Sequence, residues 1–200
     1  MAGAVAAASR FQRMYHRDSP DAVCLSRRHF LRALAGAGAA VTVAQPALAA
    51  AASAPRRLAF VHTHTSETLD IDYADLAGYV PAALQRVNEF LRDFRTDEVH
   101  AIDPTLLDLL HALARRARAD EPFHVISGYR SPRTNHALRS KSSGVARYSL
   151  HMEGKAIDIR IPDVKLATLR DTARLLRRGG VGYYPDSGFV HVDTGRVRTW

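Results

Sequence analysis

Cysteine is almost absent from this sequence: Cys24 is the one cysteine among 200 residues, and it lies in an N-terminal segment that we expect to be removed. The mature chain should therefore contain no thiol. This excludes disulfide bridges and cysteine metal ligands, so any metal must be held by histidine and carboxylate side chains.

Long apolar runs are missing as well, because no stretch after the N-terminal segment approaches the ~18 apolar residues of a membrane-spanning helix. Within that segment, the short apolar stretch 33–44 follows the run SRRHFLR (26–32) and precedes the small residues ALA (47–49). These are the parts of an export signal, and paired arginines before Phe-Leu are typical of the twin-arginine route. We predict a twin-arginine signal peptide over 1–49, a flexible leader over 50–57 and one domain over 58–200. The product should lie in the periplasm without stable membrane insertion.

Acidic residues are outnumbered, 20 against 28 basic residues, which gives a formal net charge of +8. Such an excess can indicate a nucleic-acid partner. However, six arginines against two aspartates before residue 50 supply half of it. Export removes the opportunity to meet nucleic acid, and no platform of interleaved basic and aromatic residues is present. We therefore expect no nucleic-acid partner.

Apolar periodicity predicts both strands and helices. Alternation indicates a strand from Leu58 to His64, a second at 69–73 that pairs with it as a hairpin, and three short strands at 123–127, 156–161 and 189–193. Apolar residues three or four positions apart indicate helices that begin at Pro81 and Asp103-Pro104, one over 164–178 that stops at Gly179-Gly180, and a short one near 135–138. The order is not a regular βαβ alternation. It predicts an α+β domain with a mainly antiparallel sheet and helices packed on one face.

Two of these strands carry polar residues on one face. In 156–161 the isoleucines point to one side and Asp158 to the other, and in 189–193 the valines point inward while His191 points outward. If the strands lie side by side, Asp158 meets His191, and His151 can turn back over the start of its strand. Two imidazoles and one carboxylate are a sufficient set of ligands for a tetrahedral Zn²⁺ that keeps one position for water. The alternative is that each is an isolated polar residue on a solvated sheet face.

The same residues belong to a longer pattern, Ser149-x-His151-x-x-Gly154-x-Ala156-x-Asp158, joined to a distal V-H-V-D. Together with the blocks SGYRSPRTN, SSGVARYSLHMEGKAIDIRIP and GGVGYYPDSGFVHVDTGRVRTW, this pattern resembles the murein endopeptidase K-like family of zinc peptidoglycan metallopeptidases. The resemblance covers most of 58–200. It implies a fold shared with lysostaphin-type enzymes, D-Ala-D-Ala carboxypeptidases and the hedgehog domain, and it implies that His151, Asp158 and His191 bind zinc.

The resemblance also implies roles for residues around the metal. Arg130 matches an arginine on the substrate side, which would hold a peptide carboxylate or polarise the scissile carbonyl through its paired donors. The alternative for Arg130 is a surface arginine at a strand end. Ser149, two residues before the first ligand, would orient the substrate or a neighbouring ligand.

The general base is not evident from the pattern. Many relatives place glutamate or histidine two or three residues before the last ligand, where this sequence has Phe189 and Gly188. Asp193 and Asp186 are the nearby carboxylates and are our candidates for a catalytic base. Asp193 could equally fix the tautomer of an imidazole.

A second histidine pair, His62 and His64, has the alternation to share one strand face, but no acidic partner accompanies it at a recognisable spacing. We expect a structural role in an edge strand for this pair.

These observations predict a zinc-dependent hydrolase of peptide bonds in peptidoglycan, acting on stem peptides as a murein cross-link endopeptidase. The alternatives are a D,D- or L,D-carboxypeptidase acting on stem peptides, and a cell-wall-binding module that zinc stabilises without turnover. The missing base motivates the last alternative.

Overall fold

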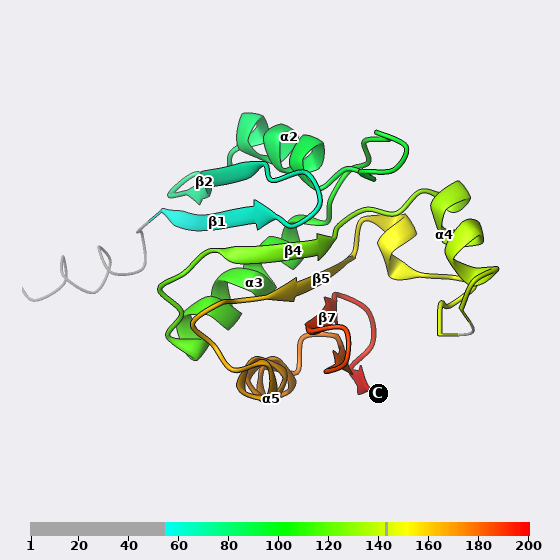
Figure 1. Cartoon of the computed structure of the whole chain (residues 1–200). Helices are drawn as coiled ribbons and strands as arrows, with labels where there is room; N and C mark the ends of the chain where they lie inside the picture. The colour runs from blue at the N-terminus through cyan, green and yellow to red at the C-terminus, as the bar shows by residue number, and fades with distance from the viewer. Residues whose placement is uncertain (1–54, 143) are drawn as a thin grey trace, which may run out of the picture. The chain divides into compact units, whose positions relative to one another are not determined.

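The computed structural model describes residues 55–142 and 144–200, and Figure 1 shows their arrangement. The strands are β1 (Arg56–His62), β2 (Thr68–Asp75), β3 (Gly78–Tyr79), β4 (Phe123–Ser127), β5 (Ala156–Arg160), β6 (Gly180–Tyr184), β7 (Phe189–Asp193) and β8 (Arg198–Thr199). The helices are α2 (Pro81–Phe90), α3 (Pro104–Ala117), α4 (Pro132–Arg139), α5 (Leu166–Leu176) and the short 3₁₀ helix η1 (Leu150–Glu153).

All of these strands form one sheet in the order β3-β2-β1-β4-β5-β7-β6-β8. Most neighbours are antiparallel, and the exceptions are the parallel pairs β1 with β4 and β6 with β8. The predicted hairpin of β1 with β2 is present. The predicted α+β class and mainly antiparallel sheet are therefore confirmed.

One face of the sheet carries the hydrophobic core. Alternate residues of each central strand, such as Phe60, Ile157 and Val192, are buried together with apolar residues of α2, α3 and α5. Figure 1 shows α3 behind β4 and β5, whereas α4 lies beyond the end of β4. Helix α4 contributes no residue to this core, so the predicted packing on one face holds for three of the helices. The opposite face is left for polar side chains from β5 and β7.

Helix α3 begins as its sequence predicts. The side chain of Asp103 accepts a hydrogen bond from the backbone N–H of Thr105, and Pro104 occupies the first helical position. Its buried stripe, Leu106, Leu107, Leu109, Leu110 and Leu113, anchors it to the core. Each such leucine contributes roughly 1.5–3 kcal/mol by its burial.

Two helices end without a glycine. Helix α2 stops at Phe90, and the chain then turns at the buried Asp93, whose carboxylate accepts hydrogen bonds from the backbone N–H groups of Arg95 and Ser131. Helix α5 stops at Leu176, and Arg177 rather than a glycine takes the left-handed conformation.

The C-terminal part of the sheet contains strands that the sequence did not predict. Gly180, expected to stop a helix, begins β6 instead. A Cβ atom on Gly182 would lie 2.8 Å from the Trp200 ring, so glycine is needed there for close packing rather than for a turn.

The N-terminal boundary of the sheet also differs slightly from the prediction. Strand β1 begins at Arg56, so Arg56 and Arg57 belong to the sheet rather than to the leader predicted over 50–57. The predicted signal peptide over 1–49 lies outside the described residues.

Candidate metal centre

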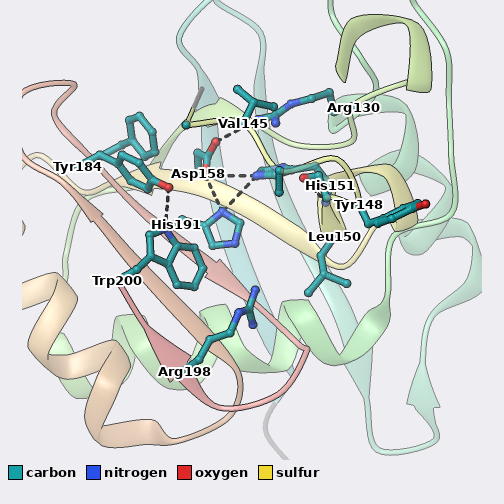
Figure 2. Close-up of a pocket in the computed structure, with 14 residues that line it drawn as sticks. Arg130, Val145, Tyr148, Leu150, His151, Asp158, Tyr184, His191, Arg198 and Trp200 are labelled. Carbon is teal, nitrogen blue, oxygen red and sulfur yellow. Dashed lines mark hydrogen bonds and ion pairs between the residues drawn. The ribbon is translucent and has the colours of Figure 1, made fainter. Parts of the chain in front are cut away.

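Three side chains converge on the polar face of the sheet. Asp158 of β5 lies directly opposite His191 of β7 in the antiparallel register, as the alternation predicted. Asp158 Oδ1 is 2.9 Å from His191 Nδ1 and 3.3 Å from His151 Nε2. The two imidazole nitrogens are 3.2 Å apart. Figure 2 shows the three side chains pointing toward one another, and this buried group could hold a metal ion.

The turn that carries His151 is built by its neighbours. The hydroxyl of Ser149 caps η1 by accepting a hydrogen bond from the backbone N–H of His151. Gly154 ends this 3₁₀ helix with φ +66°, and a Cβ atom there would collide with the carbonyl oxygen of Ala101. The chain can therefore reverse tightly and bring His151 back over the start of β5.

The outer nitrogen of each imidazole has a hydrogen-bond acceptor. His151 Nδ1 is 2.7 Å from the carbonyl oxygen of Gly128, and His191 Nε2 is 3.0 Å from Asp193 Oδ2. Because a carbonyl and an ionised carboxylate only accept, these outer nitrogens carry the hydrogens. When each ring carries this one hydrogen, the lone pairs of His151 Nε2 and His191 Nδ1 are directed at the Asp158 carboxylate, and three acceptors meet at one point.

This donor set fits a divalent metal. At metal–ligand distances of about 2.0–2.1 Å, neighbouring ligands of a tetrahedral ion lie roughly 3.3 Å apart. The three separations of 2.9, 3.2 and 3.3 Å are close to that value. Nitrogen and carboxylate oxygen are ligands that a catalytic zinc accepts.

The electrostatics of the group favour the protonation states that bind metal. Burial would raise the pKa of Asp158, but the charges and hydrogen bonds of His151 and His191 lower it below its ordinary value. Burial lowers the pKa of His151, which keeps this imidazole neutral. Burial also acts to lower the pKa of His191, but hydrogen bonds and charges of Asp158 and Asp193 outweigh it and raise this pKa. A carboxylate and a neutral imidazole are thus available, and a metal would displace any proton held by His191.

Asp193 is completely buried and faces the outer side of His191. Its carboxylate accepts hydrogen bonds from His191, from both terminal nitrogens of Arg198 and from the backbone N–H groups of Gly180 and Gly195. Burial would raise its pKa, yet these partners lower it. Both carboxylate oxygens of Asp193 are therefore already engaged in hydrogen bonds.

Asp186, the other predicted base, is exposed in the turn between β6 and β7. The cavity beside the metal centre is lined by its neighbours Tyr184 and Phe189 but not by Asp186. Phe189 stacks on Tyr184 with ring centroids 4.7 Å apart, so the position where many relatives have a base is part of an aromatic wall.

Arg130 lies beside the metal centre, not on the surface. Its Nη2 is 3.5 Å from Asp158 Oδ2, and only 12% of its side chain is exposed. Its backbone N–H donates to the carbonyl oxygen of His151, which ties the two loops together. Burial lowers the pKa of the Arg130 guanidinium, and its Nε has no hydrogen-bond partner among the described residues. Figure 2 shows this side chain reaching toward Asp158 from the side opposite His191.

A cavity of about 230 Å³ opens over the three ligands. One wall is the loop 144–150 with Ser149, and the other is formed by the aromatic side chains of Tyr184, Phe189 and Trp200. The indole N–H of Trp200 donates to the hydroxyl of Tyr184 at 2.7 Å. Figure 2 shows Trp200 beside His191 and Tyr148 at the opposite rim.

Arg198 and the aromatic wall could not be recognised from the sequence. Both depend on β8, which consists of Arg198–Thr199 and pairs in parallel with β6. A two-residue strand has no periodicity to detect. The available signal was Asp193, two residues after His191 on the same strand face, because an aspartate that becomes buried needs a cation nearby.

His62 and His64 are not part of the metal centre. Strand β1 lies between β2 and β4, so the expected edge-strand role is wrong. His62 is buried with its ring edge toward Phe90 and Phe94, and its Nδ1 accepts from the backbone N–H groups of His64 and Thr65. It closes the turn after β1, which is a structural role.

Comparison with known families agrees with these observations. A profile of the family described as peptidoglycan L,D-endopeptidase MepK matches residues 50–200. Peptidoglycan L,D-endopeptidase MepK of Escherichia coli strain K12 is 42% identical over 178 residues, which are 88% of this chain and 97% of that protein. The probable peptidoglycan L,D-endopeptidase MepK of Haemophilus influenzae is 44% identical over 147 residues, 73% of this chain and 79% of that one.

A solved structure is less similar. The crystal structure of Serratia marcescens L-Ala D-Glu endopeptidase ChiX aligns with 48% of this chain and 69% of that chain, with 20% identity. The TM-score of 0.33 is too low to indicate a common fold.

The N-terminal region matches a separate profile. Residues 24–44 match the twin-arginine translocation signal sequence, which confirms the predicted export. Across 55–142 and 144–200, every helix is too short or too polar to cross a bilayer. The predicted resemblance is confirmed as well: this chain belongs to the family of the peptidoglycan L,D-endopeptidase MepK.

Proposed function

We propose that this protein is a zinc-dependent endopeptidase that hydrolyses peptide bonds in the stem-peptide cross-links of peptidoglycan. The observation that carries the proposal is the convergence of His151 Nε2, Asp158 Oδ1 and His191 Nδ1 within 3.3 Å of one another under an open cavity. The family match supports the substrate class, because its members are named for cleaving peptidoglycan.

Zinc is the metal we assign to this centre. The ligands are two imidazoles and one carboxylate, a set found in catalytic zinc sites that keep a position for water. Zinc bound in this way lowers the pKa of a bound water to about 7 and polarises a carbonyl oxygen. The remaining work falls to the side chains around it.

Arg130 is assigned to the substrate. Its guanidinium is buried beside the Asp158 carboxylate, and its Nε has no hydrogen-bond partner within 55–142 and 144–200. A peptide carboxylate or the scissile carbonyl would complete its hydrogen bonds, and charge that develops on the carbonyl would be stabilised there. Ser149 lines the cavity and holds the turn of His151, and we assign it to contact with the same substrate.

Asp193 is assigned to the orientation of His191. A carboxylate on the outer nitrogen fixes the tautomer and raises the basicity of the nitrogen that binds metal. Asp158 is the acidic residue among the described residues that line the cavity, and we therefore assign the general base to neither Asp193 nor Asp186.

The proposal includes the finer features of the resemblance. We assign the sheet to the architecture shared by D-Ala-D-Ala carboxypeptidases and the hedgehog domain. The catalytic domain follows a signal peptide over 1–49 and a short leader, and it begins with β1 at Arg56 rather than at residue 58. Nucleic acid has no part in this function.

The test is digestion of purified cross-linked muropeptides by the mature protein, with products identified by mass spectrometry. We expect cleavage inside the cross-link, loss of cleavage after chelation and recovery with added zinc. Release of a terminal D-residue alone would instead identify a carboxypeptidase. Stoichiometric zinc without any cleavage would identify a wall-binding module and overturn the proposal.

A further inference from the structure

We infer that Arg198 is a positioning residue of the metal centre, acting through Asp193 to hold His191 with Nδ1 directed at the metal. The inference rests on the proposed zinc site. Arg198 itself touches neither the three ligands nor the reacting atoms in this account, and its effect is transmitted by one carboxylate.

The contacts form a continuous chain of three side chains. Arg198 Nη2 lies 2.7 Å from Asp193 Oδ2, and Arg198 Nη1 lies 3.0 Å from Asp193 Oδ1. This is the paired geometry in which a guanidinium binds a carboxylate most strongly. The same Oδ2 lies 3.0 Å from His191 Nε2. The guanidinium therefore fixes the oxygen that receives the imidazole hydrogen.

The charge of Arg198 is needed because two carboxylates flank one imidazole. Asp158 lies on the Nδ1 side of His191 and Asp193 on the Nε2 side, and Asp193 is fully buried. Without Arg198, the buried Asp193 carboxylate would lose its counter-charge. Its Oδ2, which Arg198 Nη2 holds, could then turn away from His191 Nε2.

The backbone is shaped around this ion pair. A Cβ atom on Gly180 would collide with both Asp193 Oδ2 and the Arg198 guanidinium. A Cβ atom on Gly195 would lie 3.0 Å from Asp193 Oδ1 and 3.4 Å from Arg198 Nη1. The N–H groups of the same two glycines donate to Asp193 Oδ1. An ordinary surface ion pair does not require two glycines beside it.

Arg198 is also held from its own side. It pairs with Gly180 through the β6–β8 ladder, its Nη1 lies 3.1 Å from the carbonyl oxygen of Arg196, and its guanidinium lies 4.8 Å from the centre of the Trp200 ring. Arg198 borders the cavity. Both of its terminal nitrogens are bound to Asp193, so they are not available as a pair of donors for a substrate carboxylate.

The experiment compares Arg198→Met and Arg198→Lys with Arg196→Met, an exposed neighbour whose side chain does not line the cavity. Zinc affinity of each metal-free protein is measured by competition with a chromophoric chelator, and folding is checked by thermal unfolding without metal. We expect Arg198→Met to weaken zinc binding about 10- to 100-fold, the range found when partners behind a ligand are removed. Arg198→Lys should be intermediate, since a point charge replaces the paired donors. Arg196→Met should bind zinc like the wild type.

A second readout reports on His191 itself. Nitrogen NMR of the zinc-loaded wild-type protein should show the His191 hydrogen on Nε2 and the metal on Nδ1, and Arg198→Met should change the Nε2 signal. A folded Arg198→Met protein with wild-type zinc affinity would overturn the inference, as would zinc bound to His191 through Nε2 in the wild type. Failure of the wild type itself to bind one zinc would instead overturn the proposed function.

Discussion

Asp158 on β5 is paired with His191 on β7 in the sheet register, and the pairing places a carboxylate oxygen 2.9 Å from the imidazole Nδ1. Two of the three metal ligands are thus positioned by backbone hydrogen bonds between strands rather than by flexible loops. A slip of one residue would turn either side chain into the core. These two ligands are therefore held as firmly as the strands that carry them.

Replacing Asp158 with asparagine tests this centre at its middle ligand. Asp158→Asn should weaken zinc binding by more than about 100-fold, which is the upper end of the loss expected when a residue behind a ligand is removed. Cleavage should be lost with the zinc. Equilibrium dialysis and the muropeptide digest measure the two effects. Asp186→Asn is the matched control, and it should keep both, because Asp186 is exposed and outside the cavity. A large loss of cleavage in Asp186→Asn with zinc retained would make Asp186 the base after all.

Arg130→Met should separate metal binding from catalysis. Because Arg130 contacts Asp158 only at 3.5 Å, zinc should stay bound. The rate of cross-link cleavage should fall by about 10²- to 10³-fold, the cost of removing one donor from developing charge. Zinc content and steady-state rates provide the check. Unchanged rates would show that Arg130 has no contact with substrate.

Gly128→Ala should disturb the hydrogen bond that orients His151. A Cβ atom at this position would lie 2.6 Å from the backbone carbonyl oxygen of Leu91, which cannot move freely. The shift would displace the Gly128 carbonyl that His151 Nδ1 contacts. We expect a loss of about 1–3 kcal/mol in the free energy of unfolding, together with weaker zinc binding. Gly144→Ala has its nearest neighbour at 3.6 Å and should be tolerated. Equal stability of the two variants in urea would contradict this reading.

His62 should make the fold sensitive to mild acid. Burial lowers the pKa of this imidazole, with the charges of His64 and Arg92 acting in the same direction and Glu67 opposing them. A histidine with a lowered folded-state pKa stabilises the fold fully above its unfolded pKa of about 6.5, and this contribution is lost as the pH falls below that value. Urea unfolding across that window should show His62→Gln with a shallower pH dependence than the wild type. The exposed His136→Gln serves as control.

The same variant tests the separation of His62 from the metal. Zinc content and cleavage at neutral pH should remain those of the wild type in His62→Gln. Loss of stoichiometric zinc would show that the first histidine pair had been excluded from the metal centre in error.

Much of the site could be predicted because it depends on local alternation. The isoleucines of β5 and the valines of β7 fix which way Asp158 and His191 point, and their pairing follows once the two strands are neighbours. The helix start at Asp103 was predictable for the same reason, since a cap residue and the following proline act within one turn.

The rest depended on contacts between distant segments. Strand β6 could not be recognised because Gly179-Gly180 was taken as the end of a helix. In the structure, side chains at Gly180 and Gly182 would collide with Arg198 and Trp200. No sequence pattern links these residues, since the clash exists only after β8 has docked. The role of Asp193 could likewise be inferred only after Arg198 had been located beside it.

The most direct test of the central claim is an anomalous difference map, recorded at the zinc absorption edge, from crystals of the zinc-loaded protein. We predict one peak bound by His151 Nε2, the Asp158 carboxylate and His191 Nδ1, with Asp193 on the opposite nitrogen of His191. No peak at these three atoms, or a metal bound through His191 Nε2, would contradict the account.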